Sequence, residues 1–182
     1  MKKSQRLSLA ICIVVSLVFL CAGLFIGSYK GWKSEYQALH DILAEGGSVE
    51  ELLSYQGADA SNLLVVAKRH LSKGIDAVKN LEQTRDALVY SSSLDARHEA
   101  YLKLSDQVKE IAVLLSASNS FQNSPRDQVY LSTLEKDLAY LGALLQASGY
   151  NQAAQDYNQR MNAAVSGKIA RLLGVKPAPV FR

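Results

Sequence analysis

Three histidines are the first candidates for chemistry, because imidazole serves both as a general base and as a metal ligand. They are His40, His70 and His98, and they fall on three different predicted helices. Neither cysteine, Cys12 or Cys21, lies near them in the sequence. A metal site needs two or more ligands to converge, so we expect packed, hydrogen-bonded histidines and no metal or cofactor.

A run of three serines, Ser91 to Ser93, offers candidate nucleophiles. A nucleophilic serine on a sharp strand-to-helix turn would need a strand before it, and the sequence predicts none. A turn that caps the next helix is the favoured interpretation. The glycines are scattered and form no phosphate-binding loop. We therefore expect no catalytic residue and a protein that is not an enzyme.

The elements that would position these side chains begin with an apolar segment. Residues 7–29 carry no charge and follow a short basic tail, residues 1–6, which contains Lys2, Lys3 and Arg6. A helix rises about 1.5 Å per residue, so about 20 apolar residues cross a hydrocarbon core of roughly 30 Å. This predicts an uncleaved transmembrane anchor and a single-pass protein of the cell membrane.

A cleaved signal peptide is the main alternative to an anchor, because the basic start suits both. The apolar run is longer than a usual signal core, and no pair of small residues marks a cleavage site at its end. A lipoprotein site at Cys21 is disfavoured, since Leu20 precedes it where a small residue is wanted.

The net charge of +3 lies in the basic tail that precedes the anchor. Three of the 20 basic residues are there, which leaves 17 to match the 17 acidic residues of the remaining chain. Nucleic-acid binding needs a basic excess to neutralise phosphates, so we do not expect a nucleic acid as a partner.

Behind the anchor, apolar residues recur at alternating spacings of three and four, and none alternate with a period of two. This predicts an all-α fold without a sheet, an antiparallel up-and-down bundle of about four long helices over residues 30–167. The expected helices cover residues 30–45, 48–55, 59–91, 94–116 and 124–165. The expected buried positions include Leu104, Val108, Ile111, Leu134, Leu138 and Leu141.

Capping residues set several of these bounds. Ser48 and Glu51 form a predicted capping box, and Gly57 is expected to end the short helix that follows. Ser124 is expected to cap the last helix, with Pro125 at its first position. Gly149 would either kink or divide that helix.

The chain has no acidic residue after Asp156 and ends in a basic tail, residues 168–182. The basic residues of this end are Arg160, Lys168, Arg171, Lys176 and Arg182. Together with Trp32, which follows the anchor, they are the candidate contacts with a membrane surface. The favoured alternative is that apolar residues between them dock the tail on the bundle.

Residues Tyr150 to Asn158 contain two Tyr-Asn pairs seven residues apart, which resemble the doubled Tyr-Asn motif of the LemA family. Ile169–Gly174 and Pro177–Phe181 resemble the family's Ala-x-x-x-Gly segment and aromatic terminus, and Asp59–Leu63 resembles its Asp-Leu-Ile-Pro-Asn-Leu. The matching residues that we expect to be structural are Asn62, Tyr150, Asn151, Tyr157, Asn158 and Gly174.

The chain departs from the family pattern at three places. The family's Phe-Pro after the second Tyr-Asn is replaced near Ala164, and Tyr55–Gly57 stands where paired arginines are found. A Thr-Glu and an Arg of the last long helix appear as Ala139-Tyr140 and Ala147. The resemblance is therefore that of a divergent member.

The resemblance implies a membrane-anchored bundle of unassigned function, mostly in bacteria, and it carries over no catalytic residue. From their spacing, Tyr150 and Tyr157 share a helix face and the asparagines share the next, so they should hydrogen-bond across helices. We expect a non-enzymatic interaction or scaffold module, whose partners are the bilayer and other membrane or envelope proteins. The alternative is a ligand sensor that signals through the anchor to a partner protein.

The orientation of the anchor stays open. The basic tail outweighs Lys30 and Lys33, which favours a cytoplasmic N-terminus and an exported bundle. The family resemblance implies the reverse orientation. A bacterial inner membrane is expected in either case.

Overall fold

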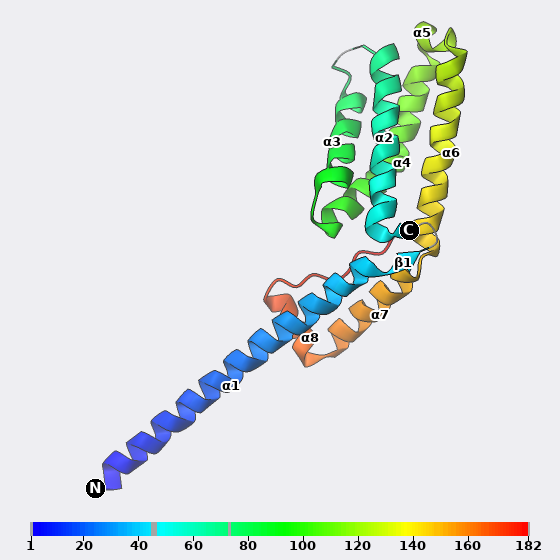
Figure 1. The fold of residues 1–182 in the computed structure, drawn as a ribbon. Coiled ribbons are helices and arrows are strands. Elements are labelled where there is room, and N and C mark those ends of the chain that lie inside the picture. The colour runs from blue at the N-terminus through cyan, green and yellow to red at the C-terminus, as the bar shows by residue number, and fades with distance from the viewer. Residues whose placement is uncertain (1, 45–46, 73, 182) are drawn as a thin grey trace. The chain divides into compact units, whose positions relative to one another are not determined.

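The computed structural model describes residues 2–44, 47–72 and 74–181. Over these residues the chain is helical apart from one short hairpin and the connecting segments, with eight α-helices (Figure 1). It divides into two compact units, which are described separately. The anchor unit contains residues 1–39 and 153–178, and the helical unit contains residues 40–152 and 179–182.

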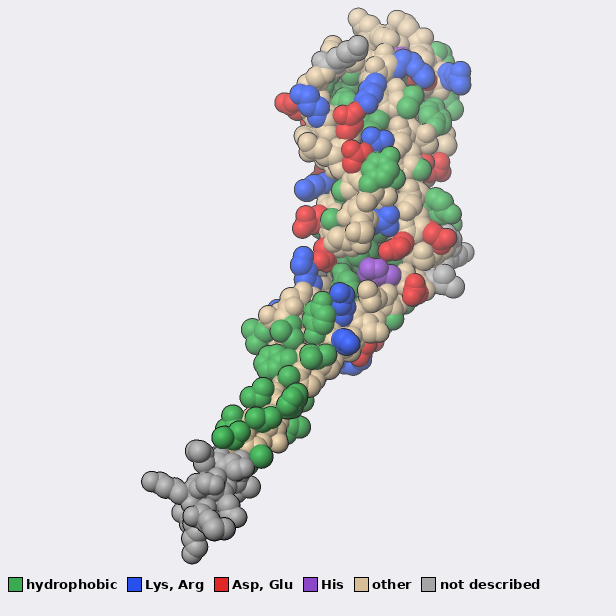
Figure 2. Space-filling view, turned by 60° about the vertical axis from the view of Figure 1, so that its left-hand side comes forward, with side chains coloured by type: hydrophobic (Ala, Val, Ile, Leu, Met, Phe, Trp, Pro, Cys, Tyr) green, Lys and Arg blue, Asp and Glu red, His purple; other side chains and the backbone are tan. Residues whose placement is uncertain are grey.

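The anchor unit is built on α1, Lys2–Ala38, an uninterrupted helix of 37 residues. Within the described chain, one stretch is long and apolar enough to cross a membrane, and it is Ile11–Asp41. Only 6% of its most apolar window is buried, so it is not the core helix of a globular unit. Figure 2 shows hydrophobic side chains along the visible face of this helix.

The anchor unit also contains most of α7, Gly149–Ala163, and all of α8, Val165–Leu172. α8 packs beside α1. Sequence reasoning predicted a single helix over 124–165, whereas the chain forms α6, Pro125–Ala147, followed by α7 and α8. The breaks fall at Ser148 and Ala164, both of which have extended backbone, so the helix is divided just before Gly149.

A hairpin follows α1 and a 3-10 turn at Leu39–Asp41. Strands β1, Leu43–Ala44, and β2, Gly47–Ser48, pair antiparallel. The prediction of a helix to residue 45 and of no sheet is therefore wrong. Gly47 has a φ of +131°, which no helix allows, and Ser48 already caps the next helix.

α2, Val49–His70, begins with the predicted capping box, which is confirmed. Ser48 Oγ accepts from Glu51 N–H, and Glu51 Oε2 accepts from Ser48 N–H at 2.8 Å. Gly57 does not end the helix, contrary to prediction. It lies inside α2 because a Cβ there would come within 2.6 Å of Val89 on α3, so the glycine allows close packing.

The expected helix over 59–91 is also wrong, because the chain turns between α2 and α3, Asp76–Tyr90. Leu71 is extended, and Gly74 has a φ of +92°. The next helices are α4, Leu94–Ser116, and α5, Asn119–Gln122. The bounds of α4 coincide with the range expected from the sequence, and Ser93 caps it, with Ser93 Oγ accepting from the Ala96 N–H.

α2 lies at the centre of the helical unit and packs against α3, α4 and α6 (Figure 1). The core of the helical unit contains fully buried residues from all four helices, and they are Leu52, Leu53, Leu63, Leu81, Leu88, Ile111, Leu115 and Leu145. Of the six expected positions on α4 and α6, five are buried. The exception is Leu141, which is half-buried.

Candidate functional site

The second Tyr-Asn pair lies in the anchor unit. Tyr157 is fully buried, its ring meets Trp32 edge-on at 5.5 Å, and its hydroxyl donates to the Trp32 carbonyl at 3.3 Å. Burial, with a smaller contribution from Glu35, raises the pKa of Tyr157 to about 12. The tyrosine therefore fixes the tail-bearing helix α7 to α1.

Asn158 holds the C-terminal tail in the same unit. Its Oδ1 accepts from the Ala178 N–H at 2.7 Å, and its Nδ2 donates to the Ala178 carbonyl at 2.8 Å. An asparagine amide can thus form hydrogen bonds with both the N–H and the carbonyl of one residue, as the backbone of a neighbouring β-strand does.

The first Tyr-Asn pair makes the same kind of contact in the helical unit. Asn151 accepts from the Phe181 N–H at 2.9 Å and donates to the Phe181 carbonyl at 2.8 Å. Tyr150 is fully buried, with its ring 5.4 Å from that of Phe181. The prediction that the asparagines bond across helices is wrong, because the extended tail offers them unpaired backbone groups.

His98 and Tyr101 of α4 complete the pocket of Phe181, with ring distances of 5.1 and 5.2 Å. His98 Nε2 also lies 3.0 Å from the Val180 carbonyl and is in position to donate to it. The end of the tail is held by burial, since Val175 and Ala178 are buried in the anchor unit and Phe181 is buried in the helical unit.

Gly174 ends α8 in a left-handed conformation, with a φ of +92°. Its N–H donates to the Arg171 carbonyl, and the Val175 N–H donates to the Ala170 carbonyl. This pattern is a Schellman motif, in which glycine takes the strained position and two apolar residues close the end. Gly174 therefore starts the extended tail.

Two candidate membrane contacts are engaged within the anchor unit. Trp32 is 8% exposed and its indole donates to Ser166 Oγ, so the expectation of a surface contact is wrong for this residue. Arg160 pairs with Glu35 at 2.9 Å and lies over the Trp32 ring. Both side chains are used to hold α7 and α8 against α1.

The remaining basic candidates lie on an exposed surface around α8. Lys168, Arg171 and Lys176 are exposed, while Arg182 lies outside the described residues. Val165 and Leu172 lie on the same face of α8 as Lys168, and they are 73% and 84% exposed. The opposite face packs through Gly167 and Ala170, which are buried.

Asn62 lies on α2, where its side chain hydrogen-bonds Asp59 one turn away. Burial and the nearby Asp137 of α6 together raise the pKa of Asp59.

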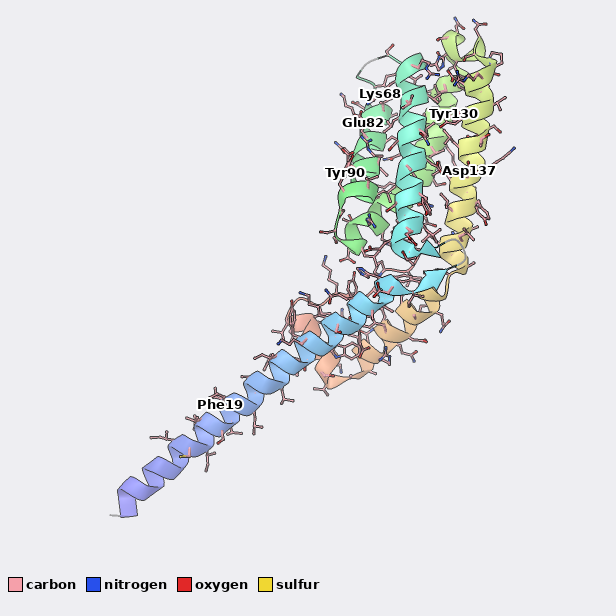
Figure 3. The ribbon with its side chains drawn as sticks, viewed as in Figure 1. Phe19, Lys68, Glu82, Tyr90, Tyr130 and Asp137 are labelled. Atoms are coloured by element: carbon pink, nitrogen blue, oxygen red, sulfur yellow. The ribbon has the colours of Figure 1, made fainter. Side chains whose placement is uncertain are left out.

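Figure 3 labels Asp137, and also Lys68 and Glu82, which form an ion pair between α2 and α3. That hydrogen bond from Lys68 lowers the pKa of Glu82.

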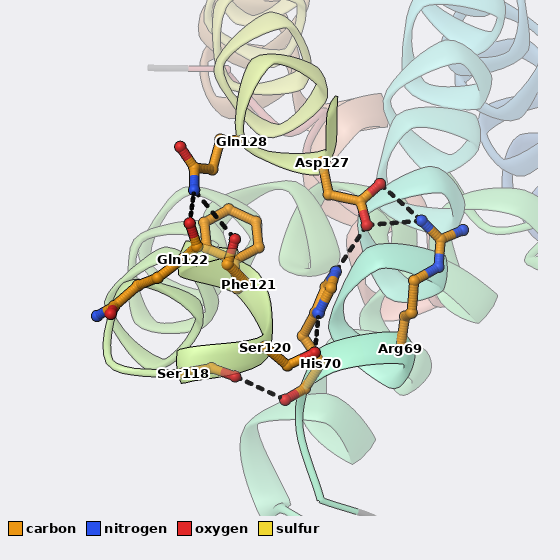
Figure 4. Close-up of polar contacts among 8 residues, drawn as sticks. All are labelled: Arg69, His70, Ser118, Ser120, Phe121, Gln122, Asp127 and Gln128. Carbon is orange, nitrogen blue, oxygen red and sulfur yellow. Dashed lines mark hydrogen bonds and ion pairs between the residues drawn. The ribbon is translucent and has the colours of Figure 1, made fainter. Parts of the chain in front are cut away.

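A polar cluster that sequence reasoning missed joins the end of α2 to the start of α6 (Figure 4). Asp127 and the His70 side chain are 5% and 4% exposed, with Oδ2 and Nε2 2.6 Å apart. Arg69 donates to both oxygens of Asp127, at 2.6 and 2.7 Å. The hydrogen bonds from Arg69 and His70 lower the pKa of Asp127 to about 2.

The cluster extends to Ser120, whose Oγ lies 2.8 Å from His70 Nδ1. A serine, a histidine and an aspartate in line resemble a hydrolase triad. Here, however, the carboxylate already neutralises Arg69, and the adjoining pocket of about 360 Å³ is lined by Arg69 and Asp127 but not by Ser120. The contacts fit a structural clamp, in which Arg69 near the C-terminus of α2 pairs with Asp127 near the N-terminus of α6.

The three histidines therefore have separate partners. His40 lies 3.3 Å from Glu50, His70 contacts Asp127, and His98 contacts the tail. Among the described residues, no group of three or more His, Cys, Asp or Glu side chains could hold a metal ion.

Comparisons of this chain with protein-family models, with curated proteins and with solved structures found no match.

Proposed function

We propose that this chain is a single-pass membrane protein in which α1 anchors an antiparallel helical bundle of the LemA type. In this proposal it acts as a non-enzymatic interaction or scaffold module at the surface of a bacterial inner membrane. Its partners are the bilayer and other membrane or envelope proteins.

The observation that carries the proposal is the apolar surface of α1. Its large apolar side chains between Ile11 and Ile26, Phe19 among them (Figure 3), are 44–73% exposed. An aqueous surface does not normally carry so long a contiguous apolar patch, whereas a bilayer would bury it. The ring contacts of Trp32 and Tyr157 join this helix firmly to the folded part of the anchor unit.

The exposed surface of α8 supports a position at a lipid headgroup layer. Val165 and Leu172 can enter the acyl boundary, while Lys168 and Arg171 pair with anionic headgroups. Among the described residues we identify one triad-like cluster, the one at Asp127. Its carboxylate is bound by Arg69 and His70, which supports a structural rather than a catalytic role.

Two native cysteines allow a direct experiment, because Cys12 and Cys21 are both exposed on α1. In intact membranes they should resist a water-soluble maleimide and should react only after detergent is added. Ser92→Cys, in the exposed turn before α4, is the matched control and should react, and its sidedness in intact cells reports the orientation. Labelling of the native cysteines in untreated membranes would contradict the proposal.

A ligand sensor is the second candidate function. The observation that favours it is a groove in the helical unit, whose lining includes a buried polar side chain.

A further inference from the structure

Gln56 of α2 is a buried polar side chain with an unsatisfied hydrogen-bond acceptor. It is 2% exposed, and its Oε1 has no hydrogen-bond partner among the described residues. A buried amide oxygen without a hydrogen bond destabilises the folded chain, so its presence here needs an explanation.

Gln56 lines a groove within the helical unit. α4 packs mainly on α3 and also on α2, and α6 packs mainly on α2, whereas α4 and α6 make little contact with each other, which leaves a space of about 490 Å³ between them. This volume lies within the range of about 300–1,000 Å³ that is typical of small-molecule sites.

The walls of the groove are chiefly apolar. Leu104 and Val108 line it from α4, and Leu138 lines it from α6. Gly142 leaves space on the α6 side of the groove, because a Cβ at this position would lie 3.8 Å from Gln56 Nε2 and 3.9 Å from the Tyr101 hydroxyl. The amide nitrogen of Gln56 therefore lies on the side of this groove, while its unpaired oxygen is buried beside it.

Polar groups gather at the Gln56 end of the groove. The Tyr101 hydroxyl and the Gln146 amide also line it, and they are 3.5 Å apart. At the mouth, Lys109 and Glu135 come from opposite walls and carry opposite charges, so the groove favours neither sign. This arrangement has a polar end for orientation and an apolar body for affinity.

We propose that this groove binds a small, uncharged and largely apolar molecule that ends in a carboxamide or a similar group able both to donate and to accept hydrogen bonds. The polar end pairs with the Gln56 amide, and the apolar body lies between α4 and α6. The ring of Tyr101 also contacts Phe181, so the bound molecule touches a residue that holds the tail.

The experiment uses the full chain in nanodiscs, with methyl NMR of its leucines and valines. The probe is 3-phenylpropanamide, and 3-phenylpropanoate is its charged counterpart. The amide should shift the methyl signals of Val108 and Leu138 and leave Leu81 unchanged. It should bind at least about threefold more tightly than the carboxylate, which corresponds to one net hydrogen bond.

Matched variants localise the binding. Ala143 and Ala147 are both exposed on α6, but only Ala143 is among the residues that line the groove. Ala143→Phe should weaken binding about tenfold or more, whereas Ala147→Phe should change it less than about twofold, because only the former fills the space. Gln56→Leu should leave a folded protein that no longer prefers the amide.

Three outcomes would overturn the inference. They are unshifted groove methyl signals, equal effects of the two phenylalanine substitutions, and equal binding of amide and carboxylate, as expected if water alone satisfies Gln56. The inference does not depend on membrane anchoring, so its failure would leave that proposal standing and remove the support for a sensor.

Discussion

The side chain of Asn151 satisfies both backbone groups of Phe181, with hydrogen bonds of 2.8 and 2.9 Å. Asn158 repeats this arrangement with Ala178. Seven helical residues rise about 10.5 Å, which is close to the roughly 10 Å spanned by three extended residues. The spacing of the two asparagines thus suits the spacing of their two partners.

This pairing predicts separable losses of amide protection. Asn151→Ala should expose the Phe181 N–H to hydrogen exchange while leaving Ala178 protected, and Asn158→Ala should do the reverse. Each loss of two hydrogen bonds should cost about 1–3 kcal/mol. Asn80→Ala, at an exposed position of α3, is the control and should change neither amide. Unchanged exchange in both variants would show that the tail is held by its apolar residues alone.

The clamp at Asp127 predicts a defined response to acid. The carboxyl has a pKa of about 2 in the folded chain, against its ordinary value of 3.8. Its contribution to stability is therefore complete above about pH 4 and is lost as the pH falls through about 2. Unfolding midpoints measured between these pH values should fall more steeply in the natural protein than in Asp127→Asn.

Asp76→Asn provides the control for this acid response, because the Asp76 side chain is 89% exposed. In Asp76→Asn the unfolding midpoint should fall with decreasing pH as steeply as in the natural protein. Equal slopes for the natural protein and for Asp127→Asn would contradict the clamp.

The core of the helical unit predicts a contrast between two positions of α4. Ile111 is fully buried and Val113 is 67% exposed. Ile111→Ala should lower the free energy of unfolding by about 2–5 kcal/mol, and Val113→Ala by less than about 0.5 kcal/mol. Leu138→Ala should cost less than Ile111→Ala, since Leu138 borders the groove. Chemical denaturation measures all three, and similar costs for Ile111 and Val113 would refute this packing.

The surface of α8 predicts contact with anionic lipid. A spin label at Leu172→Cys, with Cys12 and Cys21 replaced by serine, should be shielded from water in anionic nanodiscs. Replacing Lys168, Arg171 and Lys176 by glutamine should remove up to about 3 kcal/mol of attraction, at about 1 kcal/mol per charge, and the dependence on lipid charge with it.

A label at Val113→Cys on α4 serves as the reference for water exposure in this experiment. If the label at residue 172 is as accessible as the reference in every lipid, α8 does not lie on the membrane.

Local signals predicted the helical content well. The capping box at Ser48 and Glu51 and the serine cap of α4 at Ser93 were readable because their partners lie three residues away. The division between α2 and α3 was missed, because the apolar stripe passes through Gly74 in phase. The hairpin was missed because two-residue strands leave no period to detect.

Long-range partners could not be read from the sequence. The Tyr-Asn spacing indicated shared helix faces, but nothing local shows that Asn151 meets Phe181. The Asp127 cluster joins residues 57 positions apart, and its one available signal was a basic helix end, Lys68-Arg69-His70, facing an acidic helix start. Gln56 gave no signal, because glutamine on a helix is ordinary.

Alkaline carbonate extraction of membranes, followed by the intact mass of the recovered chain, decides whether α1 anchors the protein in the bilayer. The full chain of 182 residues should stay in the membrane pellet, since α1 is embedded in the bilayer rather than adsorbed to it. A chain recovered in the supernatant, or one shortened to a start beyond about Gly27, as signal-peptide cleavage would leave, would contradict it.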